Sequence, residues 1–362
     1  MSNLTTMGFS PFFQKDFNLI INNFPEPDRI LLLPARIIAE FRSEYEAFSE
    51  EGVIRLKPSL EFKEMEKPSV GDWVIYRKSA DGQMAGRIIA LLPRISCFYR
   101  KNAGRTSETQ IIASNVDRVL IVCGLDGDYN VRRIERLTAG VYSSGAIPII
   151  VLNKCDLMDD TSEAESDVSL ACPGVDVVVV SALYGINISL LDKYCRRLGQ
   201  TSALVGSSGA GKSTILNALI GEDRFETNSV RKHDNRGKHT TTSRFITELE
   251  GGGLIMDTPG MREFGLMVDE ESIEAVFSDI EALGKNCRFV DCTHEHEPGC
   301  AVKKAVEAGD LSEGRYNSWL SLLRENRSNL LRSDKRAVKK EARRWGTLVR
   351  EGREIRRRKE NK

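Results

Sequence analysis

A glycine-rich segment in the second half of the chain limits the fold more than any other feature. It follows the apolar run Thr201–Val205, precedes the helix-like stretch Ile215–Ile220, and consists of Gly206, Ser207, Ser208, Gly209, Ala210, Gly211, Lys212, Ser213 and Thr214. This is a complete G-x-x-x-x-G-K-[ST] pattern between a strand and a helix, in which backbone N–H groups surround a phosphate. Lys212 is expected to meet the β- and γ-phosphates, and the Ser213 hydroxyl to bind Mg²⁺. The pattern therefore predicts an α/β domain that binds a nucleoside triphosphate.

Apolar runs alternate with helix-like stretches on both sides of this loop. The runs are nearly continuous, as buried parallel strands are, and comprise Val116–Val122, Ile147–Leu152, Val175–Val180, Thr201–Val205 and Gly253–Met256. Between them lie Val131–Tyr142 and Ile188–Leu198, and Asn187 is placed to cap the second helix. The alternation predicts a doubly wound α/β sheet, whose ligands lie at the carboxyl ends of the strands.

One of these strands is followed directly by Asn153, Lys154, Cys155 and Asp156. The Asp156 carboxylate can accept hydrogen bonds from the ring N–H and the exocyclic amine of guanine, whereas adenine lacks this pair of donors. The Lys154 stem can cover the base, and Asn153 can brace the loop. Ser181 and Ala182 follow another strand and fit a second loop beside the base, where a backbone N–H would meet the guanine oxygen.

The N-K-x-D pattern is weak by itself, because Asn and Asp are ordinary turn residues at the end of a strand. Beside a phosphate loop it becomes specific and favours GTP and GDP as the ligands. The alternative is an ATP-using enzyme in which residues 153–156 are a coincidence. Competition by GDP but not ADP for a labelled nucleotide would eliminate that alternative.

Three further positions complete a predicted nucleotide site. Asp257 and Gly260 follow the last apolar run; Asp257 would hold Mg²⁺ through water, and the Gly260 N–H would reach the γ-phosphate. In residues 236–243 we favour Thr241 over Thr240 as the second hydroxyl ligand of Mg²⁺. The base loop precedes the phosphate loop, which reverses the order found in most GTPases, so the chain is interpreted as a circularly permuted G domain.

A cluster of thiols and imidazoles follows the predicted G domain. Cys287, Cys292, His294 and Cys300 lie within 14 residues of each other, and three Cys with one His match a closed tetrahedral Zn²⁺ site of structural type. His296 is a competing ligand, and unligated buried cysteines are the alternative. Because four protein ligands leave no open position, we expect one structural zinc ion rather than a catalytic one.

The N-terminal third follows a different pattern from the rest. Between about Ala35 and Arg105, short strand-like segments punctuated by Gly, Pro and Asp predict a small β-barrel, for which an oligonucleotide-binding (OB) type is one option. Residues 1–34 have no functional interpretation. The expected division is an N-terminal extension, a barrel, a G domain, an α-helical zinc-binding domain and a basic tail, at 1–34, 35–108, 109–273, 274–330 and 331–362.

The net charge of zero over 362 residues hides an asymmetry. Residues 331–362 carry 14 Lys/Arg against 5 Asp/Glu, which favours an anionic partner such as the phosphate backbone of RNA; a solvated helix end is the alternative. The apolar face of this segment is thin, which disfavours insertion into a membrane. The chain has no run of about 18 apolar residues and no signal-like N-terminus, so a cytoplasmic protein without a membrane partner is expected.

The chain resembles the ribosome small-subunit-dependent GTPase A family of circularly permuted bacterial GTPases. The similarity runs from about residue 35 to 320 and includes Val70–Val74, Asn115–Asp117, Gly237–Thr242, Asp291–His294 and Glu297–Cys300. The resemblance implies an OB barrel, a central G domain and a C-terminal zinc domain. It further implies GTP hydrolysis stimulated by the small ribosomal subunit during its late maturation. The partners expected are the subunit, its rRNA and other assembly factors, with the protein itself a monomer.

The resemblance also suggests a catalytic residue. Met261 follows Gly260 and cannot orient a water molecule, and His239 matches the residue regarded in the family as the replacement; a neutral imidazole can accept a hydrogen bond from water. The alternative is that His239 contacts only RNA or solvent. A second interpretation of the whole chain, a GTP-gated protein-binding switch without an RNA partner, differs in salt dependence, because binding through RNA phosphates weakens steeply with salt.

Overall fold

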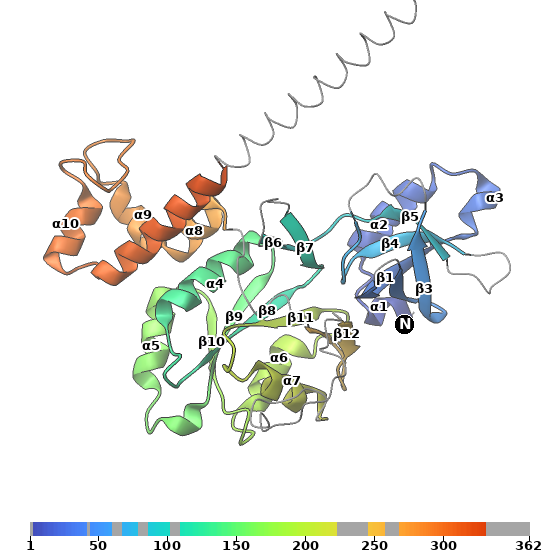
Figure 1. Cartoon of the computed structure of the whole chain (residues 1–362), viewed down its shortest axis with the longest axis horizontal. Coiled ribbons are helices and arrows are strands. Elements are labelled where there is room, and N and C mark those ends of the chain that lie inside the picture. Colours follow the sequence, from blue (N-terminus) through green and yellow to red (C-terminus); the bar gives the residue numbers. More distant parts are fainter. Residues whose placement is uncertain are drawn as a thin grey trace, which may run out of the picture. The chain divides into compact units, whose positions relative to one another are not determined.

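The computed structural model describes residues 3–41, 44–59, 67–78, 86–101, 109–222, 245–257 and 268–330. The chain divides into two compact units, Met1–Met267 and Val268–Lys362. The first unit contains a β-barrel and an α/β sheet, and the second is helical (Figure 1).

The barrel is closed by five strands in the order β1-β2-β3-β5-β4. They are β1 (Leu32–Glu40), β2 (Tyr45–Ser49), β3 (Gly52–Pro58), β4 (Trp73–Arg77) and β5 (Gly86–Leu91). β1 pairs with both β2 and β4 in antiparallel fashion, and β3 pairs with β5 in parallel. The predicted OB-type barrel is therefore confirmed. β2 was not predicted, because its buried positions, Tyr45, Ala47 and Ser49, include a polar and a small side chain and so give no apolar alternation.

The N-terminal extension packs on the barrel instead of standing apart from it. It forms α1 (Asn3–Thr6), α2 (Pro11–Ile21) and α3 (Glu26–Arg29). The rings of Phe9 and Phe13 lie 4.8 and 5.8 Å from the ring of Trp73, which is fully buried at the start of β4. The first residues of β1 fall within the segment expected to precede the barrel, because the apolar run before Pro34 begins the first strand.

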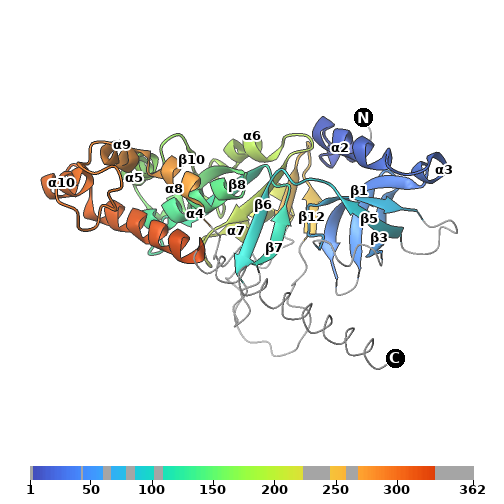
Figure 2. The ribbon, with the colours of Figure 1, turned by 90° about the horizontal axis from the view of Figure 1, so that it is seen from above.

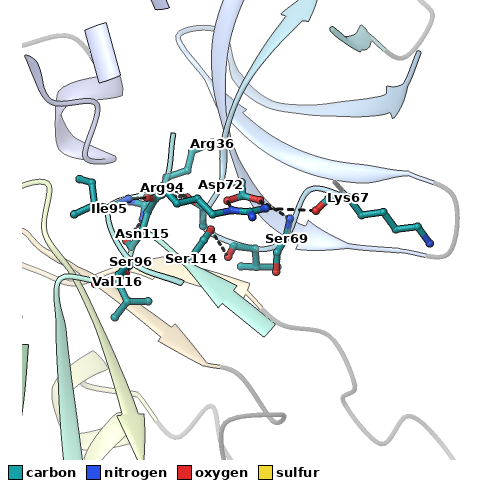
Figure 3. A network of polar contacts seen from close by, with 12 residues as sticks. Arg36, Lys67, Ser69, Asp72, Arg94, Ile95, Ser96, Ser114, Asn115 and Val116 are labelled. Carbon is teal, nitrogen blue, oxygen red and sulfur yellow. Dashed lines mark hydrogen bonds and ion pairs between the residues drawn. The ribbon is translucent and has the colours of Figure 1, made fainter. Parts of the chain in front are cut away.

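A buried arginine connects three parts of the first unit. The Arg36 guanidinium donates to the carbonyl oxygens of Met7 (2.5 Å), Gly71 (3.3 Å) and Asn115 (2.9 Å), which belong to the extension, the barrel and the segment that enters the α/β sheet. Figure 3 shows Arg36 and Asn115 within this network of polar contacts. Burial lowers the pKa of Arg36 to about 10, so the side chain stays charged at neutral pH and its donors remain engaged.

The α/β sheet has the strand order β10-β9-β8-β11-β13-β12. The strands are β8 (Arg118–Gly124), β9 (Ile147–Asn153), β10 (Asp176–Val179), β11 (Thr201–Val205), β12 (Phe245–Glu248) and β13 (Leu254–Asp257). All neighbours pair in parallel except the edge strand β12. A separate antiparallel hairpin of β6 (Cys97–Lys101) and β7 (Thr109–Ser114) precedes the sheet (Figure 2). The carboxyl ends of the five parallel strands consequently share one edge.

Helices cover both faces of this sheet, as predicted. α4 (Val131–Ser143) packs on β8 and β9, and α5 (Ser162–Ala171) packs on β10. The opposite face is covered by the short 3₁₀ turn η3 (Ile188–Leu191), α6 (Asp192–Cys195) and α7 (Lys212–Ile220), whose apolar side chains meet those of the strands in one core.

The helix expected over Ile188–Leu198 was wrong in its extent and its cap. The structure has a 3₁₀ turn followed by a single helical turn that ends at Cys195. Asn187 adopts a left-handed conformation (φ 59°) without capping, and its amide donates to the Val179 carbonyl instead. The Asn187 side chain therefore holds the loop that follows β10 against the end of that strand.

The second unit is built from α8 (Glu270–Val276), α9 (Ser278–Gly284), α10 (Ala301–Ala308) and a helix over residues 313–330. Arg315 forms two short hydrogen bonds to the Asp279 carboxylate (2.8 and 2.6 Å), which join the last helix to α9. The basic tail expected at 331–362 lies outside the described residues. None of the helices among the described residues has the length and apolar character needed to cross a bilayer.

Candidate functional site

The phosphate-loop pattern adopts a conformation that requires glycine at two positions. Gly206 has φ 143°, and a Cβ there would lie 2.1 Å from the Val122 carbonyl oxygen. Gly211 has φ 94°, a Cβ there would lie 2.1 Å from the Asn153 side-chain nitrogen, and the residue forms the N-cap of α7. Residues 212–214 are thus the first turn of a nine-residue helix, and the partial positive charge at a helix N-terminus favours an anion.

The Lys212 ammonium lies inside the curve of this loop. Its Nζ donates to the carbonyl oxygens of Gly206 (2.8 Å) and Ser207 (2.5 Å), and the residue is 7% exposed. A positive charge held beside a helix N-terminus forms a strongly anion-attracting centre. The loop therefore has the chemistry expected of a phosphate-binding site.

The Asn153 side chain joins three loops that are far apart in the sequence. Asn153 ends β9 and is 2% exposed. Its Nδ2 donates to the Ala210 carbonyl in the phosphate loop (2.9 Å), and its Oδ1 accepts from the Ala182 N–H in the second predicted base loop (3.0 Å). One amide thus fixes the spacing of all three loops at the carboxyl edge of the sheet.

The other residues of the predicted base loop face the same edge. Lys154 has a left-handed backbone (φ 66°), and its ammonium pairs with the carboxylate of Asp126. The Asp156 carboxylate accepts a hydrogen bond from the Ser181 hydroxyl, so the two segments expected to contact guanine lie against each other. Asp156 is exposed, so its carboxylate is accessible to a ligand.

A hollow of about 370 Å³ opens between the second base loop and α7. Two predicted site residues, Ala182 and Thr214, line it together with Leu183, Asn217, Ala218, Gly221 and Glu222. Its volume falls at the lower end of the range of small-molecule sites.

Asp257 lies at the same edge as the phosphate loop. It is the last residue of β13, which pairs in parallel with β11, and it is 9% exposed. The other predicted residues of this part, His239, Thr241 and Gly260, lie outside the described residues, and their roles remain predictions.

The four predicted zinc ligands converge in the second unit. Their ligand atoms all lie within 4.8 Å of one another, with 3.9 Å between the sulfur atoms of Cys287 and Cys300 and 3.5 and 3.4 Å from these to the Nδ1 of His294. Zn–S bonds of about 2.3 Å place the sulfur atoms of a tetrahedral site roughly 3.8 Å apart, so the set, completed by Cys292, fits zinc. His296, the competing candidate, is not part of this cluster among the described residues.

Neighbouring groups hold the cluster in place. The Tyr316 hydroxyl donates to the His294 carbonyl (2.6 Å), and the Trp319 ring lies 5.3 Å from the imidazole. Burial lowers the pKa of His294, which favours the neutral imidazole, the form that binds a metal ion. Glu297 accepts a hydrogen bond from the Thr293 N–H (3.0 Å) and so closes the loop between the ligands.

Comparisons with known proteins agree with this arrangement. A profile of the RsgA GTPase family matches residues 91–267. The small ribosomal subunit biogenesis GTPase RsgA 2 of Vibrio parahaemolyticus is 42% identical over 326 residues, which cover 90% of this chain and 86% of that protein. The chain belongs to the RsgA GTPase family. A second RsgA, from Opitutus terrae, is 39% identical over 94% of this chain and 95% of its own length.

Two solved structures have the same fold as this chain. The crystal structure of YjeQ from Thermotoga maritima superposes with a TM-score of 0.60 at 26% identity and covers 82% of this chain and 99% of that one. YloQ, described as a circularly permuted GTPase, superposes with a TM-score of 0.59 at 24% identity over 82% of this chain and 96% of its own. The permuted G domain expected from the order of the motifs is thus confirmed for this RsgA family member.

Two acidic residues at the predicted nucleotide site were not predicted from the sequence. Asp126 and Asp128 follow β8 and contact Lys154 and Ser207, respectively. The only local signal is that a short polar segment follows a buried strand. The contacts of Asp126 and Asp128 depend on which strands lie beside β8 in the sheet, and the sequence of this segment does not show which strands these are.

Proposed function

We propose that this chain hydrolyses GTP to GDP and phosphate during maturation of the small ribosomal subunit, and that the subunit stimulates the hydrolysis. The proposal follows from membership in the RsgA GTPase family and from relatives named as small ribosomal subunit biogenesis GTPases. The observation that carries it is the bridge that Asn153 makes between the base loop, the second base loop and the phosphate loop. This bridge joins the segment expected to read the base to the segment expected to bind the phosphates, despite their reversed order in the chain.

The nucleotide would lie along the carboxyl edge of the sheet. Asp156 would accept from the ring N–H and amine of guanine, Lys154 would cover the base, and the Ala182 segment would meet the guanine oxygen. The phosphates would lie on the first turn of α7, where Lys212 would exchange its bonds to loop carbonyls for bonds to phosphate oxygens.

Mg²⁺ would be held at the phosphate end by the hydroxyls of Ser213 and Thr241 and, through water, by Asp257. When bound, the ion would neutralise charge that develops on the phosphates. The Gly260 N–H would donate to the γ-phosphate. His239 would accept a hydrogen bond from the attacking water and so orient it, which is the role that Met261 cannot fill.

Zinc would have a structural role in the second unit. Cys287, Cys292, His294 and Cys300 would supply all four bonds, which leaves no position for a substrate. When bound, the ion would tie the segment before α10 to the segment after α9 and stabilise a unit with a small apolar core.

The partner proposed is the small ribosomal subunit, contacted in part through its rRNA by the basic residues 331–362. We further propose that the protein acts in the cytoplasm as a monomer and meets other assembly factors there. The test is the GTPase rate in three conditions: without ribosomal subunits, with purified small subunits and, as the control, with large subunits. Stimulation by small subunits alone that weakens from low to physiological salt would support the proposal, whereas equal rates in all three conditions would refute it.

A further inference from the structure

The loop that follows β8 lies between the two halves of the nucleotide site. In the sheet, β8 stands between β9, which leads into the base loop, and β11, which leads into the phosphate loop. Residues 125–130 therefore leave the sheet at the centre of its carboxyl edge. The Leu125 N–H donates to the Asn153 carbonyl (2.7 Å), which fixes this loop to the start of the base loop.

The first acidic residue of this loop reaches the base side. The Asp126 carboxylate pairs with the Lys154 ammonium, and its other oxygen accepts from the Asp128 N–H (3.1 Å), so the carboxylate is held from two directions. The hydrogen bond from Lys154 lowers the pKa of Asp126, which keeps the group charged at neutral pH. Gly124 permits this approach, because a Cβ there would lie 3.0 Å from Asp126 and 3.4 Å from the Lys154 stem.

The second acidic residue reaches the phosphate side. Asp128 accepts a hydrogen bond from the Ser207 hydroxyl and a second one from Arg133 (2.6 Å) on α4. The loop thus contacts both nucleotide-binding segments, but Asp126 alone contacts a side chain that is expected to touch the base.

We propose that Asp126 is a positioning residue for the guanine base, acting through Lys154. The inference rests on the proposed function. The carboxylate holds the ammonium end of Lys154 at the centre of the edge, so that the aliphatic stem stays extended where the base would lie. Without this anchor, a side chain with four rotatable bonds would have to be ordered each time a nucleotide binds, at a cost in conformational entropy.

This role predicts a particular kinetic pattern. The Lys154 stem would contact the base and not the reacting phosphate, so its contacts would be equal in the ground state and the transition state. Loss of such uniform binding raises KM and leaves kcat unchanged. Because the pair is about 30% exposed on both sides, we expect Asp126→Asn to weaken GDP binding about three- to tenfold.

The competing effect has the opposite sign. A carboxylate near a polyphosphate also repels it, and its removal by that effect alone would tighten nucleotide binding. Glu165→Gln is the matched control, because Glu165 is an exposed residue of α5 and its substitution removes the same charge without touching either loop. The direction of the change in Asp126→Asn therefore separates positioning from repulsion.

The experiment titrates a fluorescent GDP analogue into the full-length wild type, Asp126→Asn, Lys154→Met, the double variant and Glu165→Gln. Steady-state GTP hydrolysis is measured for each protein. We expect weaker binding and a raised KM with unchanged kcat in Asp126→Asn, no change in Glu165→Gln, and no further loss when Asp126→Asn is added to Lys154→Met. The unfolding temperature of each variant is measured without nucleotide, and a value equal to that of the wild type shows that the fold is intact.

Three results would overturn the inference. The first is unchanged or tighter GDP binding in Asp126→Asn, and the second is a lowered kcat with unchanged KM in that variant. The third is a loss of GDP affinity from Asp126→Asn that is as large in the Lys154→Met protein as in the wild type. Displacement of the analogue from the wild type by GDP but not by ADP tests the proposed function separately. If the wild type shows no preference for guanine, the proposed function fails and the inference fails with it; if the preference is present and Asp126→Asn matches the wild type, only the inference fails.

Discussion

Replacement of Asn153 by alanine should damage the nucleotide site before any nucleotide is bound. The substitution removes the donor to the Ala210 carbonyl and the acceptor of the Ala182 N–H, and both partners are buried, at 0% and 8% exposure. A buried polar group left without its partner costs about 1–3 kcal/mol, and entry of water into the space reduces the cost. For the two groups together we expect a loss of about 2–4 kcal/mol, or about 4–16 °C in unfolding temperature for a unit of this size.

Thermal unfolding of the wild type and Asn153→Ala, with and without saturating GDP, measures this loss. Asn187→Gly is the matched control, because Asn187 lies at the same edge but is exposed, its side chain makes a single bond, to the Val179 carbonyl (3.1 Å), and glycine tolerates the left-handed backbone at this position (φ 59°). The loss should be larger with GDP present, since the loops would no longer be held at the spacing that a nucleotide requires. If Asn153→Ala unfolds within 2 °C of the control, its free energy of unfolding differs from that of the control by ~0.5 kcal/mol or less. That result would show that the two hydrogen bonds of Asn153 do not hold the loops together.

Three further predictions concern other parts of the chain. Gly206→Ala should abolish nucleotide binding, measured by titration, because the new Cβ would lie 2.1 Å from the Val122 carbonyl; near-normal affinity would show that the loop adjusts. Removal of zinc by a chelator, or Cys300→Ser, should abolish the protection of the second unit from proteolysis and leave the first unit folded; an unaltered digestion pattern would contradict a structural zinc site. Burial acts to raise the pKa of Asp279, but hydrogen bonds from Arg315 lower it overall, so the pair stabilises the folded state above the ordinary carboxyl pKa of about 3.9. Arg315→Met should therefore lower the unfolding temperature at pH 7, and its difference from wild type should shrink between about pH 5 and pH 3; a difference independent of pH would refute the role of the pair.

The sequence was sufficient for the parts of the site that are encoded locally. The spacing of Gly206 and Gly211 predicts the loop because a Cβ at either position would clash with a neighbouring atom. The zinc ligands were also predictable, because thiols and imidazoles at short spacing have few other uses. The order of the base and phosphate loops along the chain was enough to infer the permutation.

Other features depend on contacts between distant segments and could not be inferred. The partners of Asp126 and Asp128 follow from the position of β8 between β9 and β11, which no local pattern encodes. The bonds of Arg36 to three carbonyls likewise require the extension, the barrel and the G domain to be folded together. By contrast, α2 could have been identified, because Pro11 at its first turn and the buried pair Phe13 and Phe17 at helical spacing are local signals.

The most direct test of the account concerns how Asp156 would read the base. A carboxylate accepts two hydrogen bonds from guanine, whereas an amide accepts one and donates one, which matches xanthine with its carbonyl in place of the amine. Competition of GDP and xanthosine diphosphate for a labelled nucleotide should therefore show a preference for GDP in the wild type and a reversed preference in Asp156→Asn. Retention of the guanine preference in Asp156→Asn would show that the base is bound elsewhere, and would contradict the assignment of the three loops to one nucleotide.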